Sequence, residues 1–79
     1  MAEEMMRLHY DPKLDLLEVS IGESQEAISE EVSEDIFFHF RPDTNQVVGF
    51  TILNLRRRFE ISEQPAVLPI VASFAPALA

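Results

Sequence analysis

The sequence has 79 residues, no cysteine and a formal net charge of −8. Disulfides and thiolate metal sites are therefore excluded, and direct contact with nucleic-acid phosphates is disfavoured. The length predicts one domain over residues 1–79, whose small core needs the support of oligomerisation. Twelve of the 14 acidic residues lie in residues 1–43. This acidic half is either a docking patch that steers a basic partner or a solvated face that keeps the chain soluble.

The two ends of the sequence bear on where the protein is located. Residues 1–6 have neither the basic region nor the apolar stretch of a signal peptide. Residues 65–79 are apolar, but they are too short and too interrupted by proline to span a bilayer. We therefore expect a cytoplasmic protein that does not enter a membrane.

The first predicted element is a β-hairpin. Residues 6–10 alternate apolar and polar side chains, which is the period of a strand with one apolar face. Residues 11–14 predict a turn, because they begin with Asp-Pro, and a return strand follows over residues 15–21. With 11–14 as the loop, Leu8 lies opposite Leu17.

The middle of the chain predicts a weak strand and then a strong one. A polar turn leads to residues 27–32, where Glu30 and Glu31 interrupt the strand pattern. After a short polar bend, residues 36–40 read Ile-Phe-Phe-His-Phe, the strongest β signal in the chain.

The strong strand predicts a second hairpin, whose return strand begins at residue 47 and ends at residue 53 or 55. With the loop ends paired, Phe38 lies opposite Gly49 and Phe37 lies opposite Phe50. Both faces of this hairpin are then apolar, so one of them needs a cover. The C-terminal segment and a second copy of the sheet are the two candidates.

The C-terminal segment predicts a short helix and then an extended arm. Asn54 is the expected cap of a helical turn near residues 54–60. The apolar stretch that follows contains Pro65 and Pro69, which disfavour a central strand or a regular helix. We therefore expect residues 60–79 to form an extended arm along an edge of the sheet.

The predicted fold is mainly β, with α+β as the alternative. It is an antiparallel meander of four to five strands over residues 5–55, completed by the helical turn and the arm.

Three segments of the sequence resemble a known family. They contain a Tyr-Asp turn, an Asp four residues later, and a later strand with a Val-Gly pair, found here at Tyr10-Asp11, Asp15 and Val48-Gly49. This pattern is similar to that of the family catalogued as domain of unknown function 2283, and the likeness covers residues 5–57.

The resemblance implies a small, mainly prokaryotic protein with no established activity. It also implies an antitoxin-like partner of a small toxin as one role. The sequence departs from the family pattern in the loop at residues 43–45, which lacks the acidic, glycine-containing turn. The apolar extension after residue 60 lies outside the pattern.

Two pairs of polar residues are the candidate chemical sites. Asp11 and Asp15 are either a carboxylate pair for a cation or for acid–base chemistry, or a turn cap and a strand end. His9 and His39 are either metal ligands or a general base, or they are strand histidines that lack a third partner. The sequence has no nucleophile elbow and no phosphate-binding loop. We expect no catalytic, cofactor or metal site, and therefore no enzyme.

The apolar surface left over after folding predicts binding to other chains. We expect a homodimer or a higher even oligomer, since both faces of the second hairpin are predicted to be apolar. The candidate interaction residues are Phe37, Phe38, Phe50, Arg56, Arg57, Arg58, Val67, Leu68, Ile70 and Phe74.

The expected function is a non-enzymatic protein–protein interaction module, and its most concrete version is an antitoxin-like binder of a basic partner. The alternative is a small-ligand-binding protein or minor enzyme with its site at the dimer seam. The polar groups of that site would be His9, Tyr10, Asp11 and His39.

Overall fold

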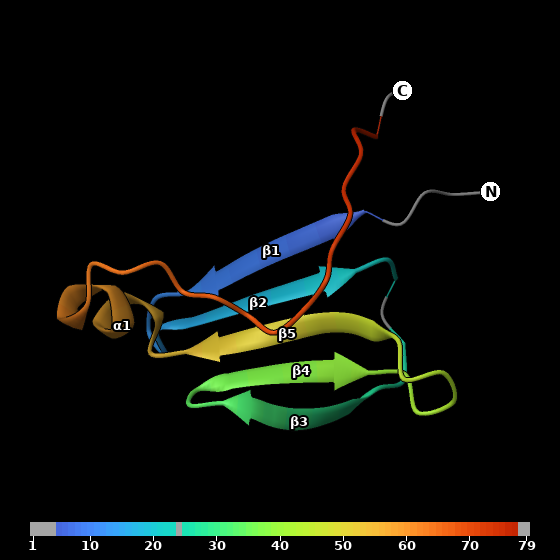
Figure 1. Ribbon diagram of the computed structural model, residues 1–79, viewed down its shortest axis with the longest axis horizontal. Helices are drawn as coiled ribbons and strands as arrows, with labels where there is room; N and C mark the ends of the chain where they lie inside the picture. The colour runs from blue at the N-terminus through green and yellow to red at the C-terminus, as the bar shows by residue number, and fades with distance from the viewer. Residues whose placement is uncertain (1–4, 24, 78–79) are drawn as a thin grey trace.

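The computed structural model describes residues 5–23 and 25–77 and shows one five-stranded antiparallel sheet, a short helix and an extended arm (Figure 1). The prediction of a mainly β fold is confirmed. The elements are β1 (Met6–Asp11), β2 (Leu16–Ile21), β3 (Ile28–Ser33), β4 (Ile36–Phe40), β5 (Val47–Leu53) and α1 (Leu55–Ile61).

The strand order in the sheet is β1-β2-β5-β4-β3. This order departs from a simple meander, because the connection after β2 carries the chain to the far edge. The chain then returns through β4 and β5, which lies in the centre between β2 and β4 (Figure 1). β1 and β3 are consequently the two open edges of the sheet.

The register of the first hairpin differs by two residues from the predicted one. Leu8 lies opposite Val19 rather than Leu17, so the predicted pairing is wrong. The reason is that Asp11 is the last residue of β1 and not the first of the loop. Its carboxylate accepts the N–H of Lys13, in the loop that follows, at 2.9 Å. The loop closes with Asp15 in the left-handed region at φ 52°. A shift by two keeps every side chain on its face, so apolar residues still meet.

A β-bulge changes the register of the second hairpin. Phe40 lies opposite Val47, as the paired loop ends predict, but the register then shifts and His39 lies opposite Gly49. Phe38 therefore lies opposite Phe50 rather than Gly49. The predicted pairs beyond the loop are wrong because β5 has one extra residue at the bulge.

The bulge sorts the side chains into two unlike faces, which overturns the prediction that both faces of the hairpin are apolar. One face, here called the core face, carries Leu17, Val19, Ile36, Phe38, Phe50 and Ile52. The other, here called the polar face, carries Arg7, His9, Glu18, Ser20, Ser29, Glu31, Phe37, His39, Gly49 and Thr51.

The core of the protein lies on the core face between the sheet and the arm. Val19, Ile36, Phe38 and Ile52 are buried there. The ring of Phe38 makes an edge contact with Phe40 at a centroid distance of 6.2 Å.

The C-terminal arm is extended, as predicted, but it does not lie along an edge. It crosses the core face, and Leu68 and Ile70 pack against the buried cluster (Figure 1). The predicted edge position is therefore corrected. The arm is the cover of the core face within one chain.

Candidate functional site

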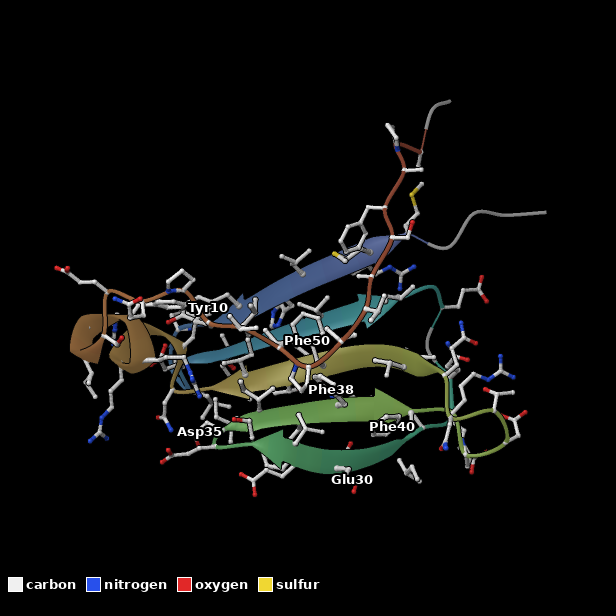
Figure 2. All side chains as sticks on the ribbon, viewed as in Figure 1. Tyr10, Glu30, Asp35, Phe38, Phe40 and Phe50 are labelled. Atoms are coloured by element: carbon white, nitrogen blue, oxygen red, sulfur yellow. The ribbon has the colours of Figure 1, made fainter. Side chains whose placement is uncertain are left out.

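The predicted interaction residues separate into core and surface groups. Phe38 is buried, while Phe50, Leu68 and Ile70 are half-buried and packed against the core (Figure 2). These side chains hold the arm on the sheet and are not free for another chain. Phe37 is half-buried on the polar face, opposite Thr51.

Two predicted interaction residues of the arm are exposed. Val67 has 85% of its surface accessible and Phe74 has 75%. Val71, which was not predicted, is fully exposed at 100%. The arm therefore presents apolar side chains to solvent on both sides of its anchored section.

The arginine cluster lies on α1 and contacts its own chain. Arg56 pairs with Glu60 at 3.8 Å, an exposed ion pair of a kind that contributes little to stability. Arg58 is half-buried, and its guanidinium donates to the carbonyl of Glu34 at 2.5 Å, in the turn between β3 and β4. Arg58 thus ties the helix to the acidic turn through a backbone carbonyl.

Sequence reasoning missed the exposed apolar side chains of β1. Met6, Leu8 and Tyr10 lie on the core face, yet Leu8 keeps 64% of its surface exposed. Their alternation predicted an apolar face, but only the strand order shows that β1 is an edge. No signal in the sequence alone would have identified them as surface residues.

The junction between the first hairpin and α1 is built around Asp15. Its carbonyl accepts the N–H of Leu55 at 3.1 Å, and its carboxylate accepts those of Arg56 at 2.9 Å and Arg57 at 3.3 Å. The hydroxyl of Tyr10 donates to the same carboxylate at 2.7 Å. Asp15 therefore satisfies the free N–H groups at the start of the helix from a distant part of the chain.

These contacts change the acidity of both partners. The hydrogen bond from Tyr10, followed by the backbone N–H of Arg56, lowers the pKa of Asp15 from its ordinary value of 3.8. The same hydrogen bond to Asp15, with some desolvation, raises the pKa of Tyr10 above 10.0.

The junction corrects the predicted helix cap. Asn54 occupies the cap position in a left-handed conformation at φ 54°, but its side chain makes no capping hydrogen bond. Its amide donates instead to the carboxylate of Asp35 at 3.2 Å. Asp15 supplies the cap, while Asp11 caps its own turn, so both carboxylates accept hydrogen bonds from backbone N–H groups.

The polar face contains a hollow of about 450 Å³. Both histidines line it, so His9 and His39 share one site even though their strands are not neighbours. Tyr10 and Asp11, which were expected beside them in the ligand-site alternative, are engaged at the hairpin end instead. The other residues that line the hollow include Arg7, Glu18, Ser20, Glu23 and Gly49.

His39 is held by hydroxyl groups at both ring nitrogens. Nδ1 lies 2.7 Å from Ser29 Oγ, and Nε2 lies 2.7 Å from the buried Thr51 Oγ1. A hydroxyl can donate or accept, so both ring nitrogens have a partner and the imidazole is fixed in orientation. Within residues 5–23 and 25–77, no group of three or more His, Asp or Glu side chains is placed to hold a metal ion.

Gly49 of β5 lines the hollow and lies opposite Ser20 of β2. A Cβ atom there would lie 2.5 Å from the carbonyl oxygen of Val19. β2 and β5 therefore approach so closely at this point that only glycine fits.

A comparison with protein-family models finds one match, over residues 7–56, described as "Protein of unknown function (DUF2283)". The matched region includes the Asp15 junction and Gly49, whereas the arm lies beyond it. No curated protein and no solved structure matches the chain. Since the match covers more than half of the sequence, the chain belongs to the DUF2283 family of proteins of unknown function.

Proposed function

We propose that this protein is a non-enzymatic interaction module that forms a homodimer and binds a basic protein partner. The observation that carries the proposal is the imbalance between buried and exposed apolar side chains. Among the described residues, four hydrophobic side chains are buried, whereas eleven large ones are exposed. A surface with this many apolar side chains is typical of a protein that contacts another chain.

The accessible surface of the chain supports the same proposal. It is 6500 Å² for a mass of 9.0 kDa. A compact monomer of this mass exposes about 4,900 Å². The excess of about 1,600 Å² per chain is enough for a stable interface, which takes about 800 Å² from each partner.

The charge distribution supports a basic partner. Glu30 and Glu31 lie exposed on the open edge strand β3, and Glu34 and Asp35 follow in the next turn (Figure 2). A basic strand or loop that approaches this edge meets complementary charge. The antitoxin-like version of the proposal rests on the family resemblance together with this charge. A purely solubilising role for the acidic residues is the competing explanation.

Light scattering on the full chain and on residues 1–60 tests self-association. We expect the full chain to have twice the mass of 9.0 kDa. Residues 1–60 lack Leu68 and Ile70, so we expect them to aggregate or to unfold at a lower temperature. A full chain that stays monomeric at high concentration contradicts the homodimer.

Titration with a synthetic peptide of alternating Lys and Val tests the basic partner. We expect binding that weakens with salt and that is lost when Glu30 and Glu31 are both changed to Gln. The matched control changes Glu60 and Glu63 to Gln, which removes the same charge elsewhere. Equal effects of the two double variants would show that the acidic residues act only through net charge.

The second candidate function is small-ligand binding, or a minor enzymatic activity, at the hollow of the polar face. The shared lining by His9 and His39 favours it. A thermal-shift screen of small polar metabolites tests it. Stabilisation of the full chain, but not of a His39→Gln variant, would favour this candidate over the interaction module.

The location of the protein also stays a proposal. No helix in the described part of the chain is long and apolar enough to cross a membrane. A cytoplasmic location is the expectation carried over from the sequence, and fractionation of cells that express the chain tests it.

A further inference from the structure

We propose that two copies of the chain join edge to edge through β1, antiparallel about a two-fold axis at Leu8, and form one continuous ten-stranded sheet. The inference rests on the homodimer proposed above and names its contact surface. It follows from the difference between the two open edges, the direction of the free backbone groups, and the side chains that symmetry brings together.

The two open edges of the sheet differ in how well they are protected from pairing. β3 carries Glu30 and Glu31 in its centre, and its register is broken by a bulge between Glu31 and Ser33. Charge and bulges are two devices that block edge-to-edge pairing. β1 is regular over its six residues, and Arg7 is its one charged side chain before Asp11, against two adjacent glutamates and a bulge in β3. β1 is therefore the edge that is free to pair.

The hydrogen bonds of the first hairpin show which backbone groups of β1 face outward. Gly22 lies opposite Met5 and donates its N–H to the Met5 carbonyl at 2.9 Å. Hydrogen-bonded and non-hydrogen-bonded pairs alternate along an antiparallel ladder. The groups of Arg7 and His9 consequently face β2, while those of Met6, Leu8 and Tyr10 face the open edge. These three residues can form a second ladder without disturbing the first.

Two-fold symmetry then selects the pairing. An axis perpendicular to the sheet keeps both core faces on the same side, so the numbers of opposed residues must add to an even sum. Centring on Leu8 sets Leu8 against its own copy, Met6 against Tyr10, and Arg7 against His9. Apolar meets apolar on the core face, and every outward backbone group of these strands finds a partner.

The neighbouring registers are less favourable. Centring on Arg7 sets the two arginines directly opposite each other, and like charges in that position destabilise a strand pair. Centring on His9 leaves the backbone groups of Met6 without partners from β1. Leu8 is therefore the preferred centre.

The arm adds contact area on the same side of the sheet. After Ile70 the chain runs outward past the β1 edge (Figure 1). Because both core faces lie on one side, the exposed Val71 and Phe74 extend toward the second copy. The radius of gyration of 13.7 Å exceeds the value of about 11.6 Å for a compact domain of this length, consistent with a chain that is extended before it pairs.

Cysteine cross-linking distinguishes the three registers, because the natural chain has no cysteine. A mixture of Arg7→Cys and His9→Cys chains, distinguished by a tag, is oxidised and its disulfide dimers are weighed. The opposed Cα atoms of a non-hydrogen-bonded pair lie about 4.5 Å apart, which a disulfide can bridge. We expect the mixed dimer to form faster than either self-dimer. The matched control on the other edge, Ser29→Cys mixed with Glu31→Cys, is expected to remain uncross-linked.

A charge substitution tests the same surface without oxidation. Leu8→Lys sets two ammonium groups opposite each other and removes an apolar pair, so the dimer dissociation constant rises about tenfold or more. Leu14→Lys is the matched control, since Leu14 is exposed to 66% and Leu8 to 64%. Both variants are expected to keep the folded circular-dichroism spectrum of the wild type.

Each outcome decides one part of the inference. A wild-type dimer, together with preferential cross-linking between Arg7→Cys and His9→Cys chains, supports it. A dimer whose cross-links form between two Arg7→Cys chains, between two His9→Cys chains, or only on β3 overturns the β1 seam at Leu8 but leaves the homodimer in place. Assemblies that grow with concentration indicate pairing of β1 with β3 and also overturn it. A monomer at every concentration overturns both the seam and the homodimer, while peptide binding still tests the basic partner.

Discussion

Replacing Gly49 by Ala is the sharpest test of how β2 and β5 are packed. The added Cβ would lie 2.5 Å from the carbonyl oxygen of Val19 and 3.3 Å from the Cα of Ser20. Both atoms belong to the backbone of β2, so no side chain can rotate away. Cβ contacts essentially never fall below 3.0 Å, so the two central strands must separate locally by about 0.5 Å.

The expected cost follows from this forced movement. Overpacking by a methyl group that moves backbone costs about 1–3 kcal/mol. Gly49 does not have a positive φ, so the alanine backbone itself is unstrained. Alanine also restricts the unfolded chain, which returns about 0.4–1 kcal/mol. A net loss of about 1–2 kcal/mol is a large part of the total for a domain of this length, about 4–12 kcal/mol.

Thermal denaturation followed by circular dichroism measures the effect. For a domain of this size the Tm falls by about 5–15 °C. Wild type and variant are compared at one protein concentration, because dimerisation makes Tm depend on concentration. Ser20→Ala is the control: it changes the exposed residue opposite Gly49 without adding an atom, and it is expected to stay within about 0.5 kcal/mol of wild type.

A Gly49→Ala protein with a Tm within about 2 °C of wild type would refute the reasoning. It would mean that β2 relaxes at no cost and that the close approach does not require glycine. The hollow on the polar face would then owe nothing to a constraint at Gly49.

Three further predictions concern the Asp15 junction and His39. Tyr10 is the only tyrosine and the chain has no tryptophan, so an absorbance titration reports its phenol alone. The midpoint of that titration is expected above 10.0 and should fall in Asp15→Asn. An unchanged midpoint would show that the hydrogen bond is not formed. The pKa of Asp15 is lowered from 3.8, so its carboxylate stabilises the fold at pH above that value, and this contribution is lost as the pH falls through the lower pKa of the folded state. The difference in urea midpoint between wild type and Asp15→Asn should therefore shrink between about pH 7 and about pH 2.5, and a constant difference would contradict the contact. Thr51→Val leaves Nε2 of His39 without its buried partner and is expected to lower the stability by about 1–3 kcal/mol, measured by thermal denaturation. Ser29→Ala should lower it less, because water reaches the exposed ring nitrogen. Equal losses of stability would count against the buried role of Thr51.

The strands were predictable from the sequence where apolar runs end at strong turn residues. β4 has the predicted bounds and β5 ends at the nearer of its two predicted limits, because Ile-Phe-Phe-His-Phe and the Val-rich run are separated by a Pro-Asp turn. The helix was also expected close to its observed position. Strand bounds and the position of a helix depend mainly on the propensities of neighbouring residues, so they can be predicted from one sequence.

The registers were not predictable because they depend on packing between distant residues. The bulge in β5 places Phe38 opposite Phe50 and Ile36 opposite Ile52, which gathers the large side chains on one face. Nothing in the loop between the strands shows that a residue is extra. The pairing of β2 with β5 also depends on residues far apart in the sequence. Because β2 pairs with β5 on its other side, β1 is an edge strand and Leu8 is exposed.

The candidate sites also contain some features that the local sequence determines and others that depend on distant residues. His9 alternates with Leu8 and His39 alternates with Phe38, so alternation along each strand is enough to put both histidines on the face away from the core. The role of Asp15 as the cap of α1 joins residues 41 and 42 positions apart, and no local pattern reveals it.

The Asp15 junction also sets an order of events as the chain folds. A helix of seven residues is too short to be stable by itself in water. Its first turn acquires hydrogen-bond acceptors only once the first hairpin has closed and Asp15 has taken its left-handed conformation. The arm follows this helix, and Leu68 and Ile70 pack on a core face that exists only when β2, β5 and β4 are paired. Until then Phe38 and its neighbours face water, so the segment that follows the helix is the one that completes the core.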